Sequence, residues 1–206
     1  ITRPTLEITT DATDPTNTSF TATFTFSEDI ASFEADDLDL INANITNFVS
    51  VSDQLFTATI TPISDGLVTL LLEEDSVEDN ANNTNLEASY SIIYDATRPD
   101  VVVSSTASDP VNTTFDVTIT FSEDVSGFDV SDLTIGNGTA SNFTGSGSLY
   151  TATITPDADG GVIVFVPEAV SQDAATNPNE ISNEFFVTYD NTAPANPVKG
   201  LPLRIV

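Results

Sequence analysis

The stretch Phe20-Thr21-Ala22-Thr23-Phe24-Thr25-Phe26 alternates strictly between an apolar residue and threonine. Neighbouring side chains of a β-strand point to opposite faces, so this pattern gathers the apolar side chains on one face and the threonines on the other. Residues 115–121, FDVTITF, show the same alternation. Strands of this kind bury one face and leave the other to solvent, which predicts antiparallel sheets around a core.

Both stretches belong to a repeat that covers almost the whole chain. Phe-Ser-Glu-Asp begins at residue 26 and again at residue 121, a spacing of 95, and Tyr-Asp begins at residue 94 and again at residue 189. Between them, Thr-Ala-Thr-Ile-Thr-Pro recurs at a spacing of 94, from residue 57 to residue 151. A repeat of this length predicts tandem domains rather than one large domain. We assign residues 1–95 and 96–192 to the two domains, and residues 193–206 to a C-terminal extension.

The spacing of the strands indicates the class of fold. In the first copy the alternation predicts seven strands, near residues 4–10, 18–26, 37–42, 44–50, 55–61, 67–73 and 87–95. Residues 68–72 and 162–166 are apolar on both faces, which favours a central place in a sheet. Short strands about every ten residues predict an all-β chain of two immunoglobulin-like β-sandwich domains, about seven strands each, arranged end to end. The polar loop from Glu74 to Asn85 has room for a short helical turn.

The composition excludes several functions. The chain has 206 residues with 32 acidic and four basic side chains, and its net charge of −28 argues against nucleic acid or an anionic membrane as partner. Cysteine, methionine, tryptophan and histidine are absent, which excludes disulfides, imidazole bases and the usual zinc sites. No apolar run approaches the roughly 20 residues that span a bilayer, so we expect no membrane insertion. No signal peptide opens the chain, and we expect it to be an internal part of a longer protein.

Strand parity brings acidic segments together at the domain junction. If the seven strands alternate in direction, the loop after the second strand and the loop before the last strand lie at the same end, where the linker also arrives. Crowded carboxylates repel one another, and a divalent cation relieves that repulsion. Oxygen donors in a shell of about six to eight favour Ca²⁺ as the cofactor. The candidate ligands are Asp95, Glu123, Asp124, Asp173 and Asn177.

The first domain offers a corresponding set, and the acids also have a simpler reading. That set comprises Glu28, Asp29, Asp79 and Asn83, while Asp190 would serve a following domain. The alternative is that the acids form only a solvated surface, as in proteins from salt-loving organisms. Two further pairs of recurring acids, Glu34 with Asp129 and Asp37 with Asp132, are expected to cap turns instead.

Taken together, these motifs resemble the bacterial Ig-like repeats that are strung along very large surface proteins and adhesins. The resemblance covers nearly all of residues 2–194. It implies an extracellular, cell-surface location and a repetitive protein of the kind that calcium often stiffens. One departure concerns the long loop, where relatives often carry Gly-Asn and this chain has Ala81-Asn82-Asn83 and Ala175-Thr176-Asn177.

The leading hypothesis is therefore a non-catalytic structural or spacer repeat of a surface protein, with an interdomain joint stiffened by Ca²⁺. Its partners would be neighbouring repeats of the same polypeptide and other copies of itself. A first alternative is a filament subunit that exchanges the apolar strand at residues 198–206 with a neighbour. A second is an adhesin module that binds carbohydrate or protein through loops that differ between the copies, residues 42–53 and 137–148.

Two further possibilities have less support in the sequence. A glycosidase would need two paired carboxylates, which exist, but the chain lacks tryptophan and most of its phenylalanines alternate into the core, so we predict no catalytic residues. Six Asn-x-Thr/Ser sequons are the common result of an Asn- and Thr-rich chain and are expected to occur by chance. They begin at Asn17, Asn44, Asn82, Asn112, Asn137 and Asn142.

Overall fold

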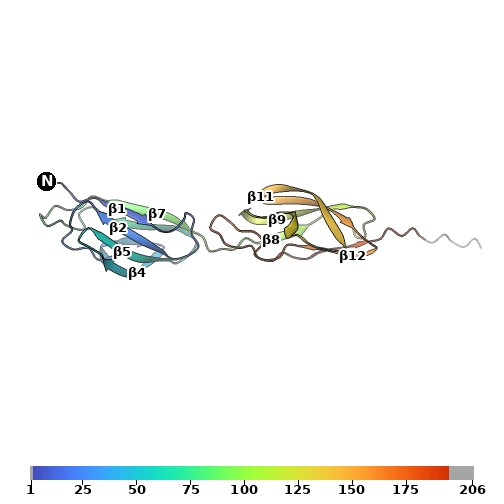
Figure 1. The fold of residues 1–206 in the computed structure, drawn as a ribbon, viewed down its shortest axis with the longest axis horizontal. Coiled ribbons are helices and arrows are strands. Elements are labelled where there is room, and N and C mark those ends of the chain that lie inside the picture. The colour runs from blue at the N-terminus through green and yellow to red at the C-terminus, as the bar shows by residue number, and fades with distance from the viewer. Residues whose placement is uncertain (1, 195–206) are drawn as a thin grey trace, which may run out of the picture. The chain divides into compact units, whose positions relative to one another are not determined.

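The structure is a computed structural model and describes residues 2–194 (Figure 1). The chain divides into two compact units. The first contains the residues up to Pro99 together with Ser171–Asn179, and the second contains Asp100–Val170 and the residues from Glu180 onward. The apolar segment 198–206, predicted to be an exchangeable strand, lies outside the described residues, as does all of the predicted extension beyond Pro194.

The first repeat has seven strands, as the alternation predicts, and they form two antiparallel sheets. One sheet has the order β1-β2-β5-β4 and the other the order β3-β6-β7. The predicted central position of residues 68–72 is confirmed, because β6 lies between β3 and β7. The strands are β1 (Leu6–Thr10), β2 (Phe20–Phe26), β3 (Asp39–Ile41), β4 (Ala43–Ser50), β5 (Leu55–Pro62), β6 (Gly66–Leu72) and β7 (Ala88–Tyr94).

The second repeat has six strands rather than seven, because residues 138–156 form one continuous element. Its sheets have the orders β11-β9-β8 and β10-β12-β13. Residues 162–165 belong to β12, which is the central strand of its sheet. The strands are β8 (Val101–Ser104), β9 (Phe115–Val125), β10 (Thr134–Gly136), β11 (Gly138–Pro156), β12 (Gly160–Phe165) and β13 (Phe185–Tyr189).

Strand β11 folds back on itself near two glycines. Ser141 donates a hydrogen bond to the Thr153 carbonyl, and the rings of Phe143 and Tyr150 stack with centroids 5.6 Å apart. A Cβ atom on Gly145 would lie 2.3 Å from the Leu149 carbonyl oxygen, so only glycine fits at this bend. The first repeat instead separates the corresponding arms into β4 and β5, which explains the different strand count.

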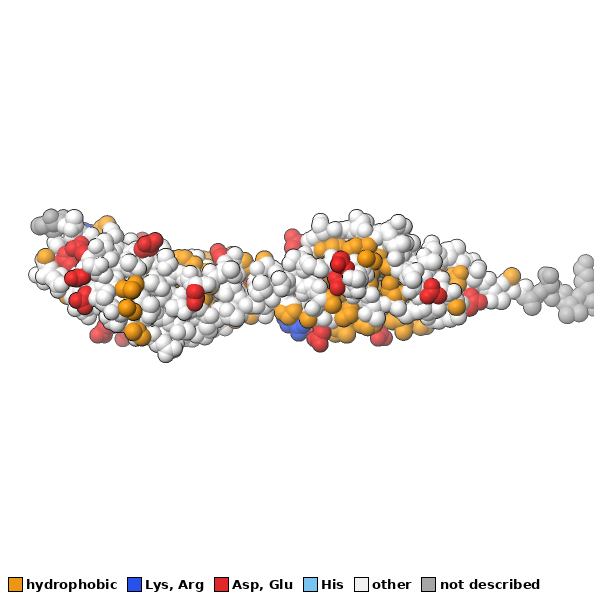
Figure 2. Space-filling model, viewed as in Figure 1, with side chains coloured by type: hydrophobic (Ala, Val, Ile, Leu, Met, Phe, Trp, Pro, Cys, Tyr) orange, Lys and Arg blue, Asp and Glu red, His pale blue; other side chains and the backbone are white. Residues whose placement is uncertain are grey.

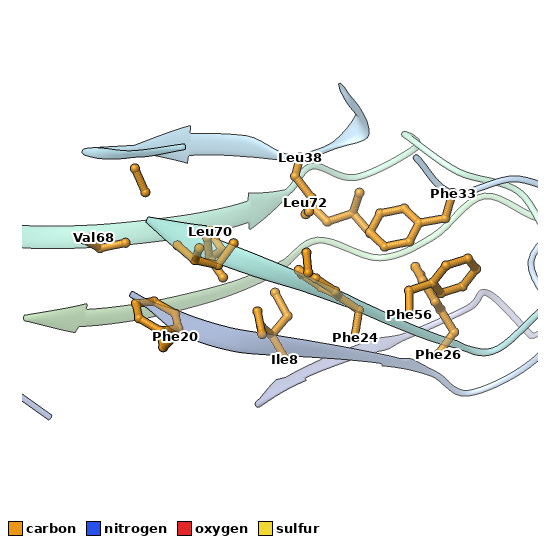
Figure 3. Close-up of a cluster of buried hydrophobic side chains, with 14 of the residues drawn as sticks. Ile8, Phe20, Phe24, Phe26, Phe33, Leu38, Phe56, Val68, Leu70 and Leu72 are labelled. Atoms are coloured by element: carbon orange, nitrogen blue, oxygen red, sulfur yellow. The ribbon is translucent and has the colours of Figure 1, made fainter. Parts of the chain in front are cut away.

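The core of the first repeat lies between its two sheets (Figure 3). The register pairs Phe20 with Ile60 and Phe24 with Phe56 across β2 and β5, which places the alternating apolar residues on one face. The side chains drawn in Figure 3 from β2 and β5 meet Val68, Leu70 and Leu72 of β6. Alternation thus produces the expected sandwich.

Each sandwich contains a 3-10 helix that an acidic side chain caps. In the first repeat the helix is η1 (Ala35–Asp37), and the Asp37 carboxylate accepts a hydrogen bond from the Glu34 backbone nitrogen at 2.8 Å. In the second it is η2 (Val130–Asp132), where Asp132 accepts from the Asp129 nitrogen at 2.7 Å. The predicted turn-capping role of these acids is confirmed.

The helical turn expected in the loop from Glu74 to Asn85 is reduced to one backbone hydrogen bond, from the Asn82 nitrogen to the Asp79 carbonyl at 3.1 Å, and this described loop contains no helix. Instead the side chain of Asn85, which is fully buried, satisfies the backbone of the loop. Its amide oxygen accepts from the Val77 nitrogen at 2.9 Å, and its amide nitrogen donates to the carbonyls of Glu73 and Leu86 at 2.7 and 2.9 Å. Side-chain hydrogen bonds therefore satisfy backbone groups of this loop that no regular element pairs.

Arginine anchors the other side of this loop. Arg3 donates to the Thr84 carbonyl at 2.8 Å and pairs with Glu74 and Asp75. Its counterpart Arg98 donates to the carbonyls of Pro178 and Asn179, both at 2.8 Å. Two of the four basic side chains thus have a structural role at equivalent positions, which the sequence analysis missed.

Within residues 2–194 the other charged side chains are acidic, and Figure 2 shows acidic side chains on both units. Among the described residues, no helix is long and apolar enough to cross a membrane.

Candidate metal centre

In the first repeat, the acids that follow β2 and those of the long loop lie together. Ile30 and Asp79 form an isolated antiparallel bridge, which holds the two segments side by side. Glu28, Asp29 and Asp79 line one pocket of about 430 Å³, together with Gln54, Asn80 and Ala81. This is the convergence that strand parity predicts for these two loops.

Asp79 is almost fully buried, and nitrogen donors surround its carboxylate. One oxygen accepts from the backbone nitrogens of Ala81 and Asn83 at 2.7 and 2.8 Å, and the other accepts from the Asn83 amide nitrogen at 2.8 Å. The hydrogen bonds from Asn83 lower the pKa of Asp79 below its usual 3.8, and the Glu28 side chain also contacts it. Asn83 therefore faces Asp79 with its nitrogen and orients the acid.

The same arrangement recurs at Asp173, which is 4% exposed. Its oxygens accept from the Asn177 backbone nitrogen at 2.8 Å and from the Asn177 amide nitrogen at 2.9 Å. That amide nitrogen also donates to the Asp95 carbonyl at 2.8 Å, and the amide oxygen accepts from the Asn17 amide at 3.0 Å. Asp95, Asp173 and Asn177 are thus brought together within the first compact unit.

The linker segment, residues 95–97, is held by an aspartate that the sequence analysis did not select. The Asp65 carboxylate accepts hydrogen bonds from the Thr97 hydroxyl and from the Ala96 backbone nitrogen, the latter at 2.8 Å. Asp159 binds Thr192 and Asn191 in the same way, with the Asn191 nitrogen at 2.7 Å. The segment that follows the last strand is therefore ordered in both repeats.

Each linker acid also folds its own turn. The Asp95 carboxylate accepts from the Thr97 nitrogen at 3.1 Å, and the Asp190 carboxylate accepts from the Thr192 nitrogen at 2.9 Å. Asp190 therefore matches Asp95 in conformation. The predicted role of Asp190 as a metal ligand at the junction with a following domain stays a prediction.

Hydrogen bonds lower the pKa of Asp65, first from the Thr97 hydroxyl and then from the Ala96 nitrogen. A folded-state pKa below the unfolded value of 3.8 means that these bonds stabilise the fold above that pH. Their contribution is lost as the pH falls through the folded-state pKa. We expect Asp65→Asn to lower the urea midpoint at neutral pH and to flatten its decline below about pH 4.

Urea unfolding between neutral and acid pH measures this effect. Asp36→Asn is a matched control, since Asp36 is exposed on η1 and also loses one negative charge. If Asp65→Asn and Asp36→Asn give parallel curves, the Asp65 hydrogen bonds do not contribute to the pH dependence.

Glu123 and Asp124 lie on a strand and not in the predicted loop, since β9 extends through Val125. Successive side chains of a strand point to opposite faces, which separates the two carboxylates. An Asp124 oxygen lies 2.6 Å from where a Cβ on Gly147 would stand, so Asp124 faces β11. Burial, and then the Asp124 charge, raise the pKa of Tyr150.

Asp29 is likewise directed at a neighbouring segment, because it accepts from the amide nitrogen of Gln54, which precedes β5, at 2.8 Å. The second acid of each Glu-Asp pair thus faces another segment of its own repeat, while Glu28 is the member that contacts Asp79. The assignment of all these residues to metal binding stays a prediction.

Asp-Pro steps form another recurring feature that the sequence analysis missed. The Asp14 carboxylate accepts from the Ile93 backbone nitrogen at 3.0 Å, and the Asp109 carboxylate accepts from the Thr188 nitrogen at 2.9 Å. Both aspartates precede a proline at a spacing of 95, and that recurrence is the signal by which they could have been found. They satisfy nitrogens of the last strand in each repeat.

Several solved structures resemble this chain at low sequence identity. It is similar to the structure of Yersinia pseudotuberculosis InvD, with 17% identity over 94% of this chain and 60% of that chain and a TM-score of 0.38. It is also similar to the Y. pseudotuberculosis adhesin InvE, with 12% identity over 90% of this chain and 58% of that chain and a TM-score of 0.36. For the N-terminal part of the bacterial S-layer protein SbsC, the identity is 17% over 92% of this chain and 44% of that chain, and the TM-score is 0.32. The chain thus spans less than two thirds of each of these structures. No curated protein sequence matches it.

A family model gives the decisive comparison. The model of the bacterial Ig-like domain matches the chain twice, over residues 1–94 and 95–189. The two matches coincide with the two copies of the internal repeat, and both copies have the antiparallel sheets described above. The chain therefore belongs to the bacterial Ig-like domain family.

Proposed function

We propose that this chain is a non-catalytic spacer segment of an extracellular surface protein. The observation that carries the proposal is the ordered linker segment, to which both Asp65 and Asn177 are hydrogen-bonded. A spacer needs order in the segment through which one repeat continues into the next, and these hydrogen bonds to the linker backbone support that order. Membership of the bacterial Ig-like domain family supports the same role.

We further propose that calcium stiffens this joint. In this proposal Asp95, Glu123 and Asp173 would each supply one carboxylate oxygen, and backbone carbonyls would complete the shell. The support comes from the first repeat, where Glu28 contacts Asp79 and both line a pocket. Glu123 and Asp173 hold the same positions in the second repeat as Glu28 and Asp79 in the first.

In this proposal the other candidate ligands orient the metal-binding acids or add negative charge. Asn177 and Asn83 donate to the aspartates, so we assign them to orienting Asp173 and Asp79 rather than to direct ligation. Asp29 and Asp124 contribute negative charge nearby. Asp190 would complete an equivalent site with a following repeat.

Thermal melting with and without calcium tests the proposal. With a Kd of about 0.1 mM, typical of extracellular modules, about 10 mM calcium adds roughly 2.7 kcal/mol per site. We expect the melting temperature to rise in CaCl₂ relative to EDTA, and this rise to vanish in Asp173→Asn. KCl at equal ionic strength controls for general screening of the acidic surface.

A matched variant separates ligation from loss of charge. Asp36→Asn removes the same charge from an exposed position on η1 and should keep the full response to calcium. Small-angle scattering gives a second measurement, since a softer joint in EDTA should change the distribution of intramolecular distances. Equal rescue by KCl and CaCl₂ would show that the acids form only a solvated surface.

A further inference from the structure

The contact between Asn17 and Asn177 joins two positions that each occur once in every repeat. Asn17 recurs as Asn112, and Asn177 has its counterpart in Asn83. Asn17 pairs with Asn177 at 3.0 Å inside the first compact unit. Asn83 in the first repeat therefore corresponds to the Asn177 side of this contact. Asn112 in the second repeat corresponds to the Asn17 side.

The loop half of this contact is already formed at Asn83. Its backbone and amide nitrogens both donate to Asp79 at 2.8 Å, compared with 2.8 and 2.9 Å from Asn177 to Asp173. The Asp79 nitrogen also donates to the Asn83 carbonyl at 3.0 Å, compared with 3.1 Å in the equivalent pair. Asn83 is thus held in the conformation in which Asn177 makes its contact.

The surface half is formed at Asn112. The residue before it, Val111, bridges Tyr189 in parallel, as Thr16 bridges Tyr94. The Asp190 nitrogen donates to the Val111 carbonyl at 2.9 Å, the same distance as from Asp95 to Thr16. The backbone that presents Asn112 therefore matches the backbone that presents Asn17.

Asn112 also lies at an open surface that could admit a loop. It is exposed, and it lines a hollow of about 320 Å³ together with Ser108, Pro110 and Thr113. The carbonyl of Asp190 takes the place that the Asp95 carbonyl has in the contact with Asn177. Both acceptor and donor for an incoming asparagine amide are thus provided.

We propose that the surface around Asn112 and Asp190, which a following repeat would use within one polypeptide, binds the Asp79–Asn83 loop of a second copy of this chain when no such repeat covers it. In this contact the Asn83 amide nitrogen donates to the Asp190 carbonyl, and the Asn112 amide donates to the Asn83 oxygen. Different surfaces of the two copies meet, so the association is heterologous and continues in a line. The inference does not need the calcium site, because its hydrogen bonds join backbone and amide groups.

Two physical costs set the conditions for its detection. A few polar hydrogen bonds support only a weak contact between separate chains, whereas repeats in one polypeptide meet at effective concentrations of about 1 mM. The net charge of −28 also makes two copies repel unless salt screens them. The association should therefore appear at high protein concentration and moderate salt.

Sedimentation of the full chain up to about 1 mM, in EDTA and in CaCl₂, measures it. We expect the average mass to rise with concentration in at least one buffer, and Asn112→Ala to weaken association about 5- to 10-fold. Asn44→Ala is the matched control, because Asn44 is an exposed asparagine on β4 that should leave association unchanged. The calcium proposal concerns the stability of single chains, so either proposal can fail while the other holds.

Mixing two variants tests the direction of the contact. Asn83→Ala chains keep the Asn112 surface, and Asn112→Ala chains keep the Asn83 loop, so a mixture should form pairs that stop at two chains. Side-chain amide signals of Asn83 and Asn112 should shift in the wild type as these pairs form. A constant mass at all concentrations in both buffers, or equal association of Asn112→Ala and wild type, overturns the proposal.

Discussion

Replacing Phe33 with alanine is expected to lower the free energy of unfolding of the first repeat by about 3–5 kcal/mol. The Phe33 ring is only 4% exposed and sits at the centre of an aromatic cluster. It packs edge-to-face against Phe26, Phe56 and Phe48, with centroids 5.0, 5.1 and 5.3 Å away. Truncation removes these contacts and leaves a cavity that the rings of β2, β4 and β5 cannot readily fill.

Calorimetry together with regional hydrogen exchange would locate the effect. We expect the loss of protection to be confined to the first repeat in Phe33→Ala, and to the second repeat in the equivalent Phe128→Ala. Phe186→Ala is a control for the loss of a ring, since Phe186 is 57% exposed on β13 and should change stability by less than about 1 kcal/mol. A similarly small change for Phe33→Ala would mean that the cluster is not the core of the fold.

The second large effect is expected from Asn85→Ala, which should cost about 3 kcal/mol or more. Asn85 is fully buried, and its side chain satisfies the backbone at Val77, Glu73 and Leu86. Alanine leaves one donor and two acceptors without that partner, and each buried unsatisfied group costs about 1–3 kcal/mol. Water entering the loop would recover only part of this loss.

Urea unfolding measures the cost, with Asn44→Ala as a control for an exposed asparagine on β4. Hydrogen exchange should rise first in the loop from Glu74 to Asn85 and then in β7, which the loop precedes. An Asn85→Ala protein as stable as the control would contradict the assignment of Asn85 as the anchor of the loop.

The strands could be predicted from the sequence because their signal is local. Alternation from Phe20 to Phe26 specifies a buried face without knowledge of any other segment. The cap at Asp37 was predictable for the same reason, since its partner Glu34 is three residues away. Local geometry also makes η1 and η2 recur at the same place in both repeats.

The errors arose where distant segments decide the structure. The long loop was expected to hold a helical turn, but it forms no helix, and the Asn85 side chain binds the backbone of Val77 and Glu73 instead. The seventh strand of the second repeat was expected because the pattern of β4 and β5 recurs there. The backbone runs continuously through Gly145 and Gly147 instead, and alternation does not reveal continuity at a bend.

In the candidate site, too, some features could be predicted from the sequence and others depend on contacts between distant segments. Parity of the strands was sufficient to predict that Glu28 and Asp79 approach each other. It did not reveal which atom of Asn83 faces Asp79, because an amide offers both an oxygen and a nitrogen. Asp65 was not selected, because its role depends on Ala96, which is 31 residues away.

The parallel bridges from Thr16 to Tyr94 and from Val111 to Tyr189 have a mechanical consequence. Tension applied along the polypeptide pulls the last strand of each sandwich and the segment between its first two strands in opposite directions. Because the paired segments run parallel, the bonds from Thr16 to Ile93 and from Asp95 to Thr16 are strained at the same time. Force must break them in shear and together, so each sandwich should resist stretching better than a hairpin that unzips one bond at a time.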